Sequence, residues 1–120
     1  MILVVDDDHT IVHMCRAILE KEGYEVRTAN SGEAAYQHVN HPSCRGMILD
    51  MLMPGINGAG LLMLMAAEGN KVPVIVLSAA PDIDADEMRD FPNVVKYVRK
   101  PFYAEDLLRL VHEHFGPRDA

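Results

Sequence analysis

The sequence has little of what secreted and membrane proteins are built from. It contains only two cysteines, Cys15 and Cys44, which cannot make a disulfide framework and fit a reducing compartment. No apolar run approaches the roughly 18 residues that a membrane-spanning helix needs. The apolar residues 1–5 lack a basic leader and a cleavage site, so they do not match a secretory signal. We therefore expect a soluble, cytoplasmic protein.

Positive charge is also scarce. The 120 residues include 11 Lys and Arg against 18 Asp and Glu, which gives a formal net charge of −7. Nonspecific binding to nucleic acid requires clustered Lys and Arg that displace counterions from phosphates, so this composition argues against it. The chain lacks repeats, linkers and low-complexity segments. Its length suits a single domain, and we expect residues 1–120 to form one domain without an output domain.

Strand and helix patterns alternate along the whole chain. Buried apolar runs and alternating patterns predict strands over residues 1–5, 24–29, 45–50, 72–77 and 94–98. Helical spacing of apolar residues predicts helices over residues 10–22, 31–39, 59–68, 81–90 and 104–115. Asp8 is the expected N-cap of the first helix, and Gly23 is expected to end it.

This alternation predicts an α/β fold. Right-handed crossovers leave a doubly wound, five-stranded parallel sheet with helices on both faces as the simplest arrangement. We expect the flavodoxin-like strand order 2-1-3-4-5. In such a sheet, ligands bind just outside the carboxyl ends of the strands.

Polar side chains follow four of the predicted strands. Asp50 ends the apolar run of the third strand, and a turn at residues 54–55 follows it. The predicted strand order places strands one, three, four and five side by side. The residues that should therefore converge at one edge are Asp6, Asp7, Asp50, Ser78 and Lys100.

The chemistry of this set indicates phosphoryl transfer. Crowded carboxylates either share protons or hold a cation, and all-oxygen ligands favour Mg²⁺, with Mn²⁺ as an alternative. The Ser78 hydroxyl and the Lys100 ammonium group both suit phosphoryl oxygens. An aspartate can act as the nucleophile and become an acyl phosphate, while positioning and charge neutralisation supply most of the catalysis.

At this point the chain resembles the CheY-like receiver domains of two-component response regulators. Four motifs carry the resemblance, in the family's order and spacing: Ile2 to Asp8, Leu49 to Gly55, Val76 to Ala79, and Lys100 to Phe102. The resemblance implies that Asp50 is the phosphoacceptor. It implies that Asp7 and Asp50 bind Mg²⁺ directly with the Leu52 backbone carbonyl, and that Asp6 holds a metal-bound water.

The resemblance also implies a switch. Lys100 would pair with the phosphoryl group, and its bond to Pro101 would be cis. Ser78 and Tyr97 would be the switch pair. The implied function is a regulatory phosphorelay switch that accepts phosphate from a sensor histidine kinase or phosphotransfer protein, assists its own phosphorylation and dephosphorylation, and is not otherwise an enzyme.

The implied output is a protein target, bound through the helix at 81–90, the fifth strand and the last helix, with homodimer formation left open. Two positions depart from the family pattern. Asn57 stands where an aspartate is common, and the acidic segment 81–90 is broken at residues 91–92 instead of carrying a run of small residues. The second departure leaves the shape of the output face open.

Two other functions fit parts of the sequence. Residues 6–10 match D-x-D-x-T, which resembles the nucleophile motif of haloacid-dehalogenase-type phosphatases, with Asp6 as nucleophile, Asp8 as acid/base, and Ser78 and Lys100 on the phosphate. That family also needs a further acidic motif and usually a cap insertion, which this sequence lacks. The other alternative is a receiver-like interaction module that works without phosphate.

Overall fold

In the computed structural model the described residues are 1–51, 58–78 and 91–117. The strands are β1 (Ile2–Val5), β2 (Val26–Ala29), β3 (Gly46–Asp50), β4 (Val74–Ser78) and β5 (Val94–Arg99). The helices are α1 (His9–Lys21), α2 (Gly32–Val39), α3 (Gly58–Ala67) and α5 (Ala104–Phe115). The helix predicted over residues 81–90 lies outside the described residues. None of the helices in the described ranges combines the length and apolar character that a bilayer crossing requires.

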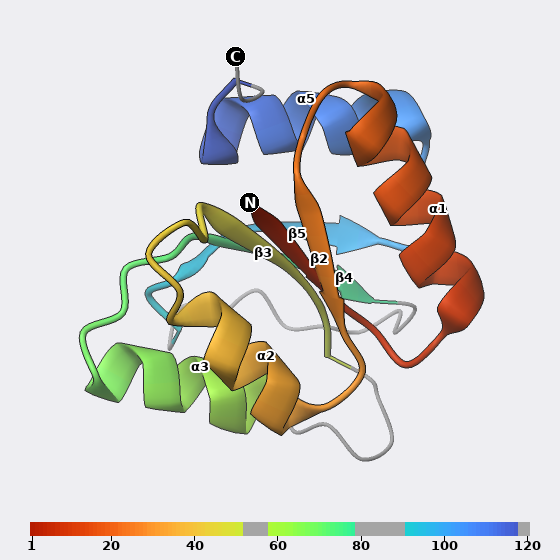
Figure 1. Cartoon of the computed structure of the whole chain (residues 1–120). Helices are drawn as coiled ribbons and strands as arrows, with labels where there is room; N and C mark the ends of the chain where they lie inside the picture. Colours follow the sequence, from red (N-terminus) through yellow and green to blue (C-terminus); the bar gives the residue numbers. More distant parts are fainter. Residues whose placement is uncertain (52–57, 79–90, 118–120) are drawn as a thin grey trace.

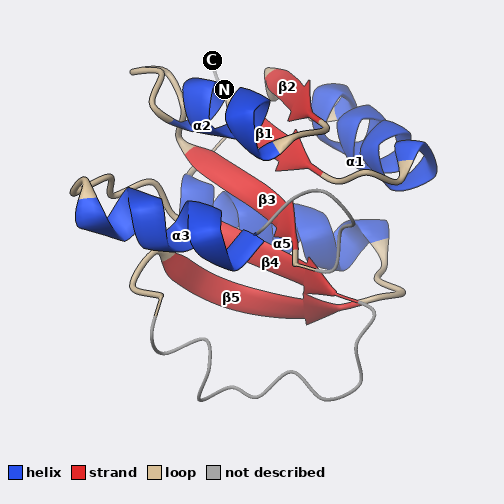
Figure 2. Ribbon diagram, turned by 90° about the horizontal axis from the view of Figure 1, so that it is seen from below, coloured by secondary structure: helices blue, strands red, loops and turns tan. Residues whose placement is uncertain are grey.

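The strands form one parallel sheet in the order β2-β1-β3-β4-β5, which confirms the predicted topology. Helices α2 and α3 cover one face, and α1 and α5 cover the other (Figures 1 and 2). This three-layer arrangement follows from right-handed crossovers between parallel strands, because each crossover helix must lie on a face of the sheet.

Alternation along the strands divides the core between the two faces. Leu3 and Leu49 pack in the cluster under α2 and α3, whereas Val4 and Ile48 pack in the cluster under α1 and α5. Strands β1, β3 and β4 are buried along their whole length, as continuous apolar runs predict for parallel strands covered on both sides. The central strands are therefore packed on both faces, and their pairing sets the register of the strand ends.

Local capping agrees with the sequence. The Asp8 side chain accepts a hydrogen bond from the Thr10 backbone N–H at 2.9 Å, which caps α1, and the Ser31 side chain caps α2 in the same way. Gly23 has a φ of 92°, a left-handed conformation that favours glycine after a helix. The Lys100–Pro101 peptide bond is cis, as predicted.

Asn93 is a buried residue that no sequence pattern singled out, and its hydrogen bonds link segments at the sheet edge opposite the predicted site. The Asn93 Nδ2 atom donates to the backbone carbonyls of Asn70, at 2.6 Å, and Val72, at 3.0 Å. The Asn70 Nδ2 atom in turn donates to the Val39 carbonyl at 3.2 Å. These bonds join the end of α2 to the segments that precede β4 and β5.

Candidate functional site

Strand register brings the predicted site residues to one edge. Val5 of β1 pairs with Leu49 of β3, so the next residues, Asp6 and Asp50, are neighbours. Asp50 in turn pairs with Leu77 of β4. Ser78 ends β4 opposite Arg99, the residue before Lys100. The four strand ends therefore converge as predicted, and they bring Asp6, Asp50, Ser78 and Lys100 to one edge.

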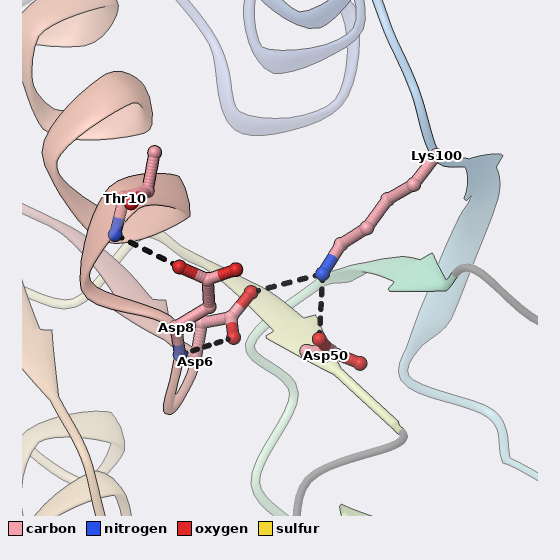
Figure 3. Close-up of polar contacts among 5 residues, drawn as sticks. All are labelled: Asp6, Asp8, Thr10, Asp50 and Lys100. Carbon is pink, nitrogen blue, oxygen red and sulfur yellow. Dashed lines mark hydrogen bonds and ion pairs between the residues drawn. The ribbon is translucent and has the colours of Figure 1, made fainter.

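A shared lysine joins the two carboxylates (Figure 3). The Lys100 Nζ atom lies 2.6 Å from Asp50 Oδ2 and 3.2 Å from Asp6 Oδ2. Asp6 is 2% exposed and Asp50 is 6% exposed, so both charges lie close to the apolar core. The Lys100 ammonium group is therefore the positive partner that these two buried carboxylates share.

Burial and charge shift the protonation of this cluster. Burial is the main cause that raises the pKa of Asp6, and the Asp50 charge acts in the same direction. Together they outweigh the hydrogen bond from the Asp8 N–H and the pairing with Lys100, which both lower this pKa. Burial alone would lower the pKa of Lys100, but its hydrogen bonds and charge pairing with Asp50 and Asp6 raise it. Lys100 is therefore a permanent cation at the site.

Asp7 and Asp8 lie outside this cluster. Both side chains are exposed, and Asp8 caps α1, so the carboxylate that joins Asp50 and Lys100 is that of Asp6. Outside residues 52–57, 79–90 and 118–120, no three His, Cys, Asp or Glu side chains lie close enough together to hold a metal ion. Lys100 already sits between the two buried carboxylates, while Asp7 faces solvent. Leu52 and Asn57 lie outside the described residues.

The donor set nevertheless suits a hard cation. Asp6 and Asp50 place carboxylate oxygens on either side of the Lys100 ammonium group at the carboxyl ends of β1 and β3, and Asp7 follows Asp6 directly along the chain. Oxygen ligands and excess negative charge are what Mg²⁺ requires in proteins. The residues present therefore fit a magnesium ion.

The two residues of the predicted switch pair lie on adjacent strands. Ser78 is fully buried, and its backbone carbonyl accepts a hydrogen bond from the Lys100 N–H at 2.8 Å. Tyr97 pairs with Val76 on β4 and packs against the cluster under α2 and α3. The Tyr97 hydroxyl is buried, and within the described part of the chain no group forms a hydrogen bond with it. The phenol therefore points inward.

A buried cysteine lies behind the carboxylates. Burial, together with the negative charge of Asp6, raises the pKa of the Cys15 thiol to about 12. The helical apolar spacing places Cys15 in the core, but no pattern in the sequence links it to Asp6. Only the packing of α1 against β1 brings the thiol near the site.

The fold and the site define a class of protein. A five-stranded parallel sheet of this order, with an aspartate at the end of β3 facing a lysine after β5, is the arrangement of a CheY-like receiver domain. The family model for the response regulator receiver domain matches residues 2–112, and the chain belongs to this family. Receiver domains are regulatory; they take phosphoryl groups from histidine kinases and generally bind Mg²⁺ at the phosphorylation site.

Curated relatives are themselves response regulators. The chain is 35% identical over 111 residues to the regulatory protein VanRB of Enterococcus faecalis. The aligned residues make up 92% of this chain and 50% of that protein. It is 31% identical over 107 residues to the response regulator MprA of Mycobacterium leprae, covering 89% and 47%. The chain therefore spans about half the length of the curated relatives it matches.

Solved structures agree in fold. The receiver domain of NtrX from Brucella abortus is 28% identical, with a TM-score of 0.85 over 96% of this chain and 98% of that one. A putative response regulator from Chloroflexus aurantiacus is 34% identical, with a TM-score of 0.82 over 95% of both chains. These matches favour the receiver interpretation over the phosphatase interpretation of residues 6–10.

Proposed function

We propose that this domain is a phosphorylation-dependent switch in which Asp50 accepts a phosphoryl group from a sensor histidine kinase or phosphotransfer protein. The observation that carries the proposal is the position of the Asp50 carboxylate, at the carboxyl end of β3 and 2.6 Å from the Lys100 ammonium group. Asp50 is the last residue of the buried strand β3, and the donor would approach it from the carboxyl ends of the strands. The proposal includes a cytoplasmic location, where a sensor histidine kinase or phosphotransfer protein would supply the phosphoryl group.

The transfer needs one nucleophile and one cation from this chain. An Asp50 oxygen attacks the phosphorus of phosphohistidine; the new P–O bond forms as the P–N bond breaks, and the leaving imidazole keeps the bonding pair and takes up a proton. Lys100, already bound to the carboxylates, pairs with the phosphoryl oxygens as they arrive. Attack of water on the phosphorus later releases phosphate and restores the carboxylate. The domain thereby assists both its own phosphorylation and its own dephosphorylation.

The same residues hold the metal in this proposal. Asp7 and Asp50, with the Leu52 backbone carbonyl, would hold Mg²⁺ directly, and Asp6 would hold it through a water. When bound, Mg²⁺ neutralises charge on the transferring phosphoryl group. The buried carboxylates of Asp6 and Asp50 support this assignment because they place oxygen ligands side by side at the ends of β1 and β3.

The output proposal rests on the connection from Lys100 to β4 and β5. The Ser78 hydroxyl bonds the phosphoryl group, and Tyr97 responds behind it, which alters the face formed by β5 and α5, where a target protein docks. The backbone bond between Lys100 and Ser78 supports this route. Residues 81–90, which the prediction includes in that face, lie outside the described residues.

Phosphorylation at one residue tests the function. Incubation with acetyl phosphate or a phosphorylated histidine kinase plus Mg²⁺ should label the protein with a single hydroxylamine-sensitive phosphate, which peptide mapping places on Asp50. Asp50→Asn keeps nearly the same shape, so it should remain folded and lose the label. Omission of Mg²⁺ should also prevent labelling.

Asp6→Asn is the matched comparison. It should slow labelling without moving the label from Asp50, because Asp6 acts beside the acceptor and not as the acceptor. A label on Asp6, or phosphomonoester turnover that survives Asp50→Asn, would instead establish the phosphatase. If none of the phosphate donors labels the protein, the remaining interpretation is a receiver-like interaction module that works without phosphate.

A further inference from the structure

Helices α2 and α3 run side by side on the face of the sheet opposite α1 and α5 (Figures 1 and 2). Residues of both helices line a hollow between them. Its volume is about 360 Å³. We call this hollow the α2–α3 groove, and its lining residues are Gly32, Glu33, Tyr36, Gly60, Leu61 and Leu64. None of these residues belongs to the phosphoacceptor site.

The helices are clamped together at one end of this groove. The Tyr36 hydroxyl hydrogen-bonds the Glu68 carboxylate, 2.8 Å from each oxygen. Nearby, the Asn70 Nδ2 atom donates to Asn40 Oδ1 at 3.0 Å. At the other end, a Cβ atom added to Gly32 would meet nothing within 4 Å. Packing therefore does not require glycine at this position, and the missing side chain leaves the groove open.

Apolar side chains border the opening. Leu61 lines the groove and is buried, whereas Leu64 lines it and is 41% exposed. Single exposed apolar residues are ordinary, but an exposed leucine that lines an apolar hollow is typical of a binding surface.

The rim of the groove is acidic. Glu33 is exposed on the α2 side, and Glu68, also exposed, lies on the α3 side at the clamped end. Both acids stand on a chain whose net charge is −7. A second copy of this chain would bring the same acids against them, so like charges oppose self-association here. A basic partner meets complementary charge on both sides of the apolar centre.

We propose that the α2–α3 groove binds an amphipathic helix of a partner protein, with aliphatic side chains seated against Leu61 and Leu64 and flanking Lys or Arg residues beside Glu33 and Glu68. Helix-in-groove recognition places apolar anchors at spacings of three and four residues, which suits a groove that follows two helices. This surface is distinct from the β5–α5 face assigned to output.

A model peptide tests the proposal directly. The probe is a fluorescently labelled peptide of about 15 residues, long enough to form a helix, with leucines at helical spacing and lysines elsewhere. A scrambled peptide of the same composition keeps the charge and removes the apolar face. Fluorescence anisotropy measures both Kd values for the full chain.

Two variants alter the groove by different means. Gly32→Trp should fill it, and Leu64→Ser should remove an apolar contact; each should raise the Kd of the amphipathic peptide by about tenfold or more, as expected for central contacts of an interface. The matched control is Met14→Ser on α1, where Met14 is 37% exposed, and it should leave the Kd unchanged. Circular dichroism checks that each variant is folded.

Three results would overturn the proposal. If the scrambled peptide has the same Kd as the amphipathic peptide, charge attraction alone accounts for the binding. An unchanged Kd in both folded groove variants would place the peptide elsewhere. Sedimentation that shows a dimer of the chain, converted to monomer by Leu64→Ser, would make a second copy the occupant.

Discussion

Asp6 carries its charge where water hardly reaches it. The Asp6 side chain is 2% exposed, and this burial is the main reason that the pKa of its carboxyl group is raised in the folded protein. The folded state therefore binds the Asp6 proton more tightly than the unfolded chain does. Its contribution to stability is present below the ordinary aspartate pKa of about 3.9 and is lost as pH rises through the raised folded value. At neutral pH the ionised Asp6 carboxylate lowers stability.

We predict that Asp6→Asn raises the free energy of unfolding at pH 7 by on the order of 1 kcal/mol in the absence of Mg²⁺. Asparagine keeps the oxygen that accepts from the Asp8 N–H, and Lys100 keeps its closer partner, Asp50. Urea unfolding at pH 7 and at pH 4 measures the effect, which should shrink at the lower pH. The exposed Asp7→Asn control should stay within about 0.5 kcal/mol. A less stable Asp6→Asn protein would contradict this account.

The Cys15 thiol titrates only at very high pH in the folded protein. Its pKa is raised to about 12, so the folded state holds the proton while an unfolded thiol, with a pKa near 8.5, releases it. Stability contributed by this group therefore falls as pH rises through that window.

We predict that folded protein at pH 8 resists alkylation at Cys15 and reacts once unfolded. Between about pH 8.5 and 10.5 the wild-type protein should lose on the order of 1–2 kcal/mol more stability than Cys15→Ala does. Mass spectrometry after iodoacetamide and urea unfolding provide the two measurements. Rapid alkylation of the folded chain would show that the thiol is not buried as described.

At the scale of elements, β3 and α5 meet at a position where only glycine fits. A Cβ atom on Gly46 would overlap ring atoms of Phe115, which is itself buried. The ring therefore packs directly on the backbone at the start of β3. This contact joins the strand that carries Asp50 to the helix that follows Lys100.

We predict that Gly46→Ala lowers the free energy of unfolding by about 1–3 kcal/mol, the usual range for an overpacked core. Gly32→Ala is the matched control, because a Cβ there meets nothing within 4 Å; it should be neutral or slightly stabilising. Urea unfolding of both variants measures the difference. Equal stability of the two variants would show that Phe115 can move without cost.

At the scale of the whole molecule, Asp50, the proposed phosphoacceptor, is connected to the β5 side of the sheet. Lys100 pairs with Asp50 through its side chain and bonds the Ser78 carbonyl through its backbone N–H. A ligand shifts a conformational equilibrium only by its differential affinity for the two states, so the response can be partial.

We predict that beryllium fluoride with Mg²⁺ changes amide exchange across residues 94–103. Mg²⁺ alone should raise the Tm in the millimolar range, because it binds the folded state preferentially. Hydrogen exchange with mass spectrometry and thermal scans measure the two effects, and Asp50→Asn should abolish the first. If amide exchange changes only in peptides that contain Asp6 or Asp50, the phosphoryl analogue does not alter the conformation of the proposed output face.

The sequence by itself determined the strand and helix order, the sheet topology and the polar ends of β1, β3, β4 and β5. These features follow from local signals: hydrophobic periodicity, caps such as Asp8 and Ser31, and the crossover rule. Because parallel strands end at one edge, the meeting of Asp6 and Asp50 was predictable before any packing was known.

Tertiary packing alone decided which side chains are buried at that edge and which stay exposed. Asp6 and Asp7 are adjacent in sequence, yet Asp6 joins Lys100 while Asp7 faces solvent. Along α3, which is apolar on every side, periodicity could not show that Met63 is exposed and Met65 buried. Burial depends on which elements lie beside a residue in space. Because these elements can be distant along the chain, the local sequence pattern does not identify them.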